Sequence, residues 1–201
     1  MCYDADTSLL AWTLAYSIAY FLFNRNKNYD RWNASFIICF TTVQLIEAGI
    51  WTSKDNSDLN DLLTRLLLLA LLAQPLTQSY MGAVYTNEAM LWAMTCVFVG
   101  VFIWGLWRTS RGKFQSVTGI GGHLNWRDES RNYFLGPPLI TYAYLAGLFI
   151  PLLFMKECRG IPLIIVGLGT AIYSTFLTSP QEFGSMWCFT SVIYAMFALF
   201  V

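Results

Sequence analysis

The sequence predicts an all-α fold, a polytopic bundle of seven transmembrane helices forming one domain over residues 1–201, with a small β-hairpin in the loop between the fourth and fifth helices. Three observations predict it. The chain is 56% hydrophobic and 12% charged, against about 25% charged in an average soluble domain. Seven apolar segments follow one another, and most reach the ~17–25 residues that cross a bilayer as a helix. Apolar runs such as residues 66–73 lack the alternation of a membrane barrel strand.

Short polar or turn-rich loops separate the seven apolar segments. We place the segments at residues 8–23, 34–51, 62–80, 89–107, 135–155, 161–178 and 183–201. The last four contain no Asp, Glu, Lys, Arg or His. Pro75 predicts a kink in the third helix, with Gln74 or Thr77 covering a freed backbone group. Pro137 and Pro138 start the fifth helix, where a missing N–H costs little.

The longest non-apolar stretch runs from residue 108 to residue 134 and has an internal order. Residues 113–118 and 123–127 are short, partly β-prone runs on either side of Gly119-Ile120-Gly121-Gly122. Glycines supply the positive φ that tight hairpin turns need. A small β-hairpin on the membrane surface is therefore predicted in this loop.

Composition also argues against several classes of protein. The 12 basic and 12 acidic residues cancel, so no basic field points to nucleic acid as a partner. The five cysteines have no CxxC spacing and predict no disulfide framework. A retinal protein needs a lysine within a span for the Schiff base. The four lysines lie in loops or at helix ends, at positions Lys27, Lys54, Lys113 and Lys156.

An odd number of spans places successive loops on alternating sides of the membrane. Glu47, near the end of the second helix, then lies on the same side as the N-terminus, the 108–134 loop and the start of the seventh helix. The residues with distinctive chemistry all fall in this layer, and they form the candidate pocket: Cys2, Gln44, Glu47, Trp51, His123, Ser185, Trp187 and Cys188. We expect Glu47 to lie near the start of the seventh helix, which offers free N–H groups and the positive end of its dipole.

Each candidate also has a purely structural interpretation. An ionisable side chain within a span costs about 2.5–3.5 kcal/mol and indicates a functional site by default, but Glu47 could instead link helices through Gln44 or reach interfacial water. A loop histidine such as His123 commonly packs a hairpin. A lone Cys188 is typical of a small core hydrophobe. Trp51, Trp126 and Trp187 suit an interfacial aromatic belt.

Four short motifs, spread along the chain, resemble a known family. They are Met1-Cys2-Tyr3-Asp4, the stretch Gln44–Trp51 with its Gln-x-x-Glu pattern, Gly122–Trp126, and Ser185-Met186-Trp187-Cys188-Phe189. Together these resemble the uncharacterised multi-pass membrane proteins of bacteria and giant DNA viruses. The resemblance implies a membrane location, in a virion or host-cell membrane for the viral members, but no reaction.

Three functions from different classes remain open at this stage. The first is a non-catalytic membrane protein that binds a small molecule, a lipid or a protein partner in the pocket. The second is a membrane-embedded enzyme, either a zinc-dependent lipid hydrolase with Cys2, Glu47, His123 and Cys188 as ligand types, or a cysteine–histidine nucleophile pair. The third is a transporter of ions or small solutes, for which a polar path and an internal repeat would be expected.

Overall fold

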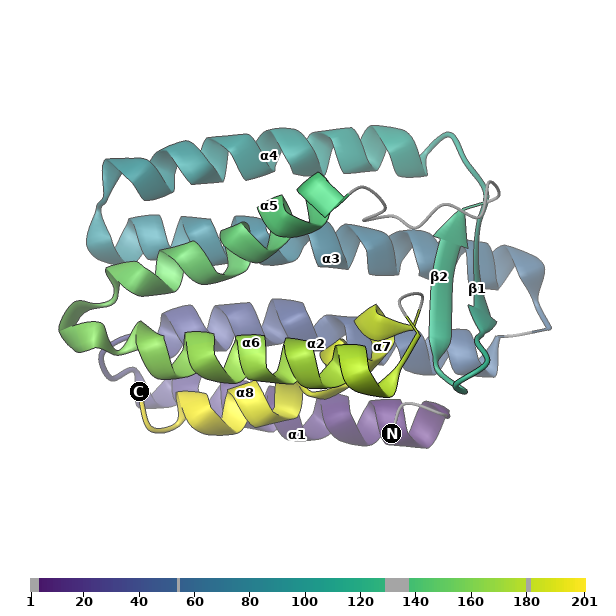
Figure 1. The fold of residues 1–201 in the computed structure, drawn as a ribbon, viewed down its shortest axis with the longest axis horizontal. Coiled ribbons are helices and arrows are strands. Elements are labelled where there is room, and N and C mark those ends of the chain that lie inside the picture. Colours follow the sequence, from purple (N-terminus) through teal and green to yellow (C-terminus); the bar gives the residue numbers. More distant parts are fainter. Residues whose placement is uncertain (1–3, 54, 129–137, 180–181) are drawn as a thin grey trace.

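The computed structural model describes residues 4–53, 55–128, 138–179 and 182–201, which are mostly helical. Long antiparallel helices lie side by side in an elongated bundle, and a β-hairpin crosses one end of it (Figure 1). The elements in chain order are α1 (Ala5–Arg25), α2 (Asp30–Thr52), α3 (Ser57–Thr86), α4 (Ala89–Thr109), β1 (Phe114–Thr118), β2 (Leu124–Asp128), α5 (Pro138–Phe149), the 3₁₀ helices Ile150–Phe154 and Lys156–Cys158, α6 (Gly160–Leu177), α7 (Phe183–Phe189) and α8 (Ser191–Ala198).

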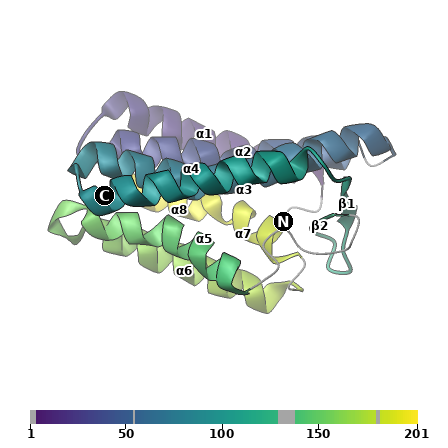
Figure 2. The ribbon, with the colours of Figure 1, turned by 90° about the horizontal axis from the view of Figure 1, so that it is seen from above.

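Different helix ends lie at the two ends of the bundle. We call the end that carries the hairpin the hairpin end (Figures 1 and 2). It contains the start of α1, the end of α2, the start of α3, the end of α4 and the end of α6. The chain finishes at the opposite end, which we call the α8 end. This alternation is the arrangement that the odd number of apolar segments predicts.

Four helices, α2, α3, α4 and α6, are long and apolar enough to cross a membrane. Among the described residues, α1 has sufficient length but a lower hydropathy, and the fifth and seventh segments form shorter apolar helices. The seventh segment forms the shorter apolar helix Phe183–Ala198, which a one-residue turn at Thr190 divides into α7 and α8. The Thr190 hydroxyl donates to the Trp187 carbonyl oxygen at 2.7 Å, a local bond that competes with regular helix geometry.

The distribution of side chains on the outer helices is the reverse of that on a soluble bundle. α1 buries a narrow stripe of small residues, including Ala11, Ala15 and Ala19, and exposes leucines and aromatic rings on its outer face. On α4, Val97 is 63% exposed and Ile103 is 60% exposed. Small residues at helix contacts and large apolar residues outside are typical of helices that pack within lipid. A soluble protein rarely exposes so large an apolar surface.

The predicted hairpin is confirmed. β1 and β2 pair antiparallel, with a register that runs from Phe114 opposite Asp128 to Thr118 opposite Leu124. Gly122, in the turn, has a φ of 84°, a conformation that favours glycine. α3 holds one edge of the hairpin through Asn60, whose side chain accepts from the Ser116 N–H at 2.9 Å and donates to the Ser116 carbonyl at 3.1 Å. This pair of bonds imitates a third strand.

Candidate functional site

The candidate site begins with Glu47, whose carboxyl is completely buried in the last part of α2. Gln44 lies one turn earlier on nearly the same face, and its amide nitrogen donates to Glu47 Oε2 at 2.9 Å. Gln44 is also fully buried. The sequence-based pairing of these two residues is therefore present. It leaves the second carboxyl oxygen, Oε1, without a hydrogen-bond partner among the described residues.

Two further side chains come to Glu47 from elements distant in sequence. Ser185 lies in α7, which packs against α2, and Trp126 lies in β2. The Ser185 hydroxyl and the Trp126 indole N–H both face the Glu47 carboxyl. Neither group has a partner at full hydrogen-bond geometry within the described chain. We call Gln44, Glu47, Trp126 and Ser185 the Glu47 site, and its Glu47–Ser185 proximity is the one expected from the alternating topology.

The hairpin covers the Glu47 site because glycines let it approach α7 closely. A Cβ on Gly184 would lie 2.5 Å from the Trp126 ring, so the glycine leaves the space that the indole occupies. On the other side of the turn, Glu182 Oε1 accepts from the Gly121 N–H at 2.9 Å. A Cβ on Gly119 would come within 1.9 Å of that same carboxyl oxygen. Two glycines on the hairpin and α7 therefore seat the hairpin as a lid.

Glu182 is a site residue that the sequence analysis missed. It is 1% exposed, and its second oxygen accepts from the Ser179 hydroxyl at 2.9 Å. Glu182 lies three residues before Ser185 and therefore on the same face of the chain as the Glu47 site. This spacing is the signal that could have identified it.

Trp126 was treated as one of several interfacial tryptophans. Leu124 and Trp126 lie two residues apart and so share one face of the strand, which is the signal that Trp126 points inward.

His123 lies at the hairpin turn and is 3% exposed. Burial lowers the pKa of His123 below its ordinary value of 6.5, and the nearby Glu182 carboxylate opposes that shift. The neutral imidazole is thus the form that the fold favours. The structural interpretation of His123, as a residue that packs the hairpin, accounts for this placement.

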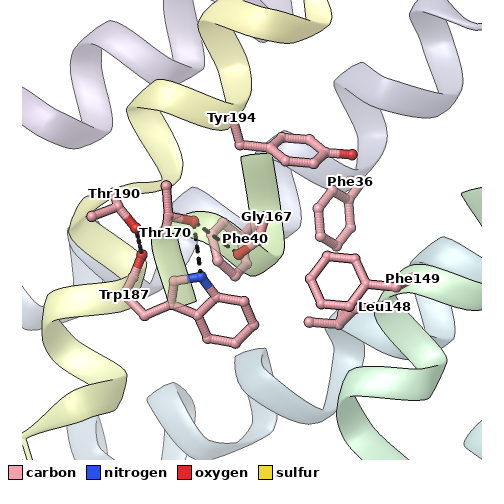
Figure 3. A pocket seen from close by; sticks show the side chains of 9 residues that line it. All are labelled: Phe36, Phe40, Leu148, Phe149, Gly167, Thr170, Trp187, Thr190 and Tyr194. Carbon is pink, nitrogen blue, oxygen red and sulfur yellow. Dashed lines mark hydrogen bonds between the residues drawn. The ribbon is translucent and has the colours of Figure 1, made fainter. Parts of the chain in front are cut away.

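Trp187 lines an aromatic pocket with Phe36, Phe40 and Phe149 (Figure 3). Its indole N–H donates to the Thr170 hydroxyl oxygen at 3.3 Å, and its ring stacks on Phe183 at 5.5 Å between centroids. Phe40 packs against it edge to face. The volume of this pocket is about 20 Å³, about the room of one water molecule.

Three of the four predicted zinc ligands, Glu47, His123 and Cys188, lie in the described residues, among which no group of three or more His, Cys, Asp and Glu side chains could hold a metal ion. Cys2 lies outside the described residues. Cys188 is 1% exposed and belongs to an apolar cluster with Val43 and Leu67, the environment of a small core hydrophobe. Trp51 packs at the edge of the same cluster.

The Glu47 site thus presents a carboxyl group, a hydroxyl and an indole N–H to one another in a space closed to solvent. This set can accept and donate hydrogen bonds to a small polar molecule, and the carboxyl can also exchange a proton. Comparison with protein-family models, with curated proteins and with solved structures finds no match to this chain.

Proposed function

We propose that this chain is a multi-pass membrane protein that binds a small polar molecule at the Glu47 site, beneath the hairpin lid. One observation carries the proposal: the buried Glu47 carboxyl faces two buried donors, on Ser185 and Trp126, and both contacts fall short of full hydrogen-bond geometry. Such loose contacts stabilise less than a good hydrogen bond, which contributes about 1 kcal/mol. A small molecule with both donor and acceptor groups would complete hydrogen bonds to all three side chains.

The membrane part of the proposal extends the four long apolar helices to seven crossings. The outward apolar faces of α1 and α4 support it, as does the placement of the chain's two described ends at opposite ends of the bundle. α5 continues into the 3₁₀ helix Ile150–Phe154, and together they give the fifth crossing. α7 and α8 together give the seventh. Reporter fusions at the two termini test this topology, and both reporters in one compartment would refute it.

The test of the binding site compares Glu47→Gln with Leu66→Gln. The first change keeps the shape of the side chain and its carbonyl acceptor but removes the ability to ionise. Leu66 is 45% exposed on α3, so its replacement reproduces the cost of placing an amide in the membrane. Each protein is purified in mild detergent and denatured, and the released small molecules are quantified by mass spectrometry.

We expect a stoichiometric polar compound from the wild type and from Leu66→Gln, and its loss from Glu47→Gln. The unfolding free energy of Glu47→Gln should fall by no more than about 1 kcal/mol, because the amide oxygen still accepts from Gln44. Equal retention by both variants would leave Glu47 with a structural role and would refute the proposal.

Transport is the second candidate function, and a specific observation favours it. Polar side chains continue from Glu47 through the middle of the bundle on α2 and α3: Thr41, Gln74 and Gln78 are completely buried. Each has a polar atom without a partner among the described residues. Reconstitution into liposomes with a pH-sensitive dye inside separates the two functions. Flux that disappears in Glu47→Gln would favour transport over simple binding.

The enzyme interpretation gains no support from the described residues, which form no metal group.

The motifs at Gln44–Trp51 and Ser185–Phe189 carry our further proposal that the chain belongs with the multi-pass proteins of bacteria and giant DNA viruses. Three of the four site residues, Gln44, Glu47 and Ser185, come from those two motifs. On this proposal the membrane is that of a virion or a host cell.

A further inference from the structure

An apolar cavity that does not include the Glu47 site lies where α3, α4 and α5 meet. Its volume is about 240 Å³. Its walls are Leu72 and Pro75 from α3, Phe98, Val101 and Trp104 from α4, and Ala143 and Tyr144 from α5. α5 runs obliquely across α3 in this region (Figure 1). An apolar cavity of about 150 Å³ already stays dry and binds a ring such as benzene, so this one has room for a hydrocarbon ligand.

Close helix contacts at two glycines bound the cavity. A Cβ on Gly105 would lie 2.1 Å from a methyl group of Leu72, which brings α4 onto α3. A Cβ on Gly147 would lie 2.2 Å from Phe98 and 2.7 Å from Pro75, which brings α5 onto both neighbours. The helices are therefore held together by these contacts, while the space between the contacts stays open.

Tyr144, one of the lining residues, has its hydroxyl hydrogen-bonded to another side chain. The Tyr144 hydroxyl donates to Gln74 Oε1, so Tyr144 offers its ring rather than its hydroxyl to the cavity wall. Pro75 adds no donor, because proline lacks a backbone N–H. The remaining lining atoms belong to Leu, Val, Phe, Trp and Ala side chains. Apart from the indole N–H of Trp104, these side chains offer a polar ligand no hydrogen-bond partner to replace those it leaves in water.

We propose that this cavity holds the hydrocarbon chain of a membrane lipid. Leu72 and Pro75 stand at the middle of α3, which spans Ser57–Thr86, and this places the cavity at the depth where lipid chains lie. Trp104 is 39% exposed as well as lining the cavity, so the cavity reaches the lipid-facing side of α4. A chain entering between α4 and α5 stays in hydrocarbon throughout.

The test fills the cavity from two sides. Val101→Phe adds a ring from α4 into the space, and Ala143→Leu adds a branched chain from α5. Val99→Phe is the matched control, since Val99 is 41% exposed on the same helix and is not among the cavity walls. Each protein is reconstituted with dioleoylphosphatidylcholine, extracted, and delipidated stepwise, and native mass spectrometry counts the lipids that remain bound.

We expect the wild type and Val99→Phe to keep one phosphatidylcholine after the others are removed, and both cavity-filling variants to lose it. Added lipid should raise the melting temperature of the wild type and of Val99→Phe, but not that of the filled variants. Retention of the last lipid by Val101→Phe or Ala143→Leu, in protein that still melts cooperatively, would overturn the proposal. Glu47→Gln should keep the lipid, which separates this result from the outcome at the Glu47 site.

Discussion

α2 carries a buried carboxyl near each of its ends, and the two carboxyls differ in their hydrogen-bond partners. Asp30, at the α8 end, is 2% exposed and accepts from Arg25 Nε at 2.8 Å, from Arg25 Nη2 at 2.6 Å and from the Lys27 N–H at 2.7 Å. Glu47, at the hairpin end, has one such bond, from Gln44. Both are buried to the same degree, so burial alone does not identify a functional acid.

The completeness of the hydrogen bonds is what separates the two carboxyls. Arg25 also donates to the Leu199 carbonyl oxygen at 2.9 Å, so the Asp30 pair ties α1 and α2 to the end of the chain. Every oxygen of Asp30 has a protein partner and no place remains for a ligand. At Glu47 the donors of Ser185 and Trp126 face the carboxyl without full hydrogen-bond geometry. The hydrogen bonds of Asp30 thus hold the fold together, whereas the looser contacts of Glu47 are the basis of the proposed binding site.

The largest effect is expected from breaking the saturated carboxyl. Asp30→Asn removes the ion pair and leaves the part-buried charge of Arg25 without its partner, which should lower the unfolding free energy by about 3 kcal/mol. Asp58→Asn, at an exposed position in the first turn of α3, is the control and should change it little. Denaturant titration in detergent measures both. If Glu47→Gln cost as much as Asp30→Asn, the distinction between the two carboxyls would fail.

A smaller effect is expected from displacing the hairpin that covers the Glu47 site. Gly184→Ala places a methyl group against the Trp126 ring and should cost about 1–2 kcal/mol through overpacking. Because alanine favours helix more than glycine does, any loss must come from the displaced lid. Amide exchange in β2 should speed up. Gly169→Ala in α6, where a Cβ would meet nothing within 4 Å, should be neutral or stabilising, and equal exchange in both variants would count against the lid.

The smallest effect concerns pH. Burial lowers the pKa of His123 below 6.5, so below that pH the unfolded chain takes up a proton that the folded hairpin resists. The contribution of His123 to stability is therefore present above pH 6.5 and is lost as pH falls, by less than about 1.4 kcal/mol per pH unit. Hairpin amide exchange on either side of pH 6.5 measures it. A pH dependence that persists unchanged in His123→Gln would assign it to another group.

Hydropathy and turn chemistry predicted the helices and the hairpin, and the alternation of loops predicted the meeting of Glu47 and Ser185. Which way a side chain faces was harder to predict. Trp187 was placed with Glu47 because both belong to one layer, and sequence reasoning did not predict that its indole N–H donates to Thr170 on α6. In a helix that is apolar on all sides, periodicity does not reveal the inner face.

The contacts that hold the hairpin in place also could not be predicted from the sequence. Asn60 holds Ser116 across 56 positions of the chain, and Glu182 holds the glycine turn across 61 positions. Both are polar residues near helix ends, where such residues are common for many reasons. Their roles follow from the docking of two distant elements, which depends on the packed shape of the whole bundle.

The length of α3 sets where the lid stands relative to the bilayer. Its 30 residues extend about 45 Å, whereas the hydrocarbon core is about 30 Å thick. A helix centred in the membrane therefore projects beyond the lipid chains by about 7 Å at each end, or roughly one and a half turns. Asn60, which binds the hairpin, belongs to the projecting part. On the proposed topology the hairpin lies among the lipid headgroups, and molecules that bind at the Glu47 site arrive through that layer rather than from the bilayer interior.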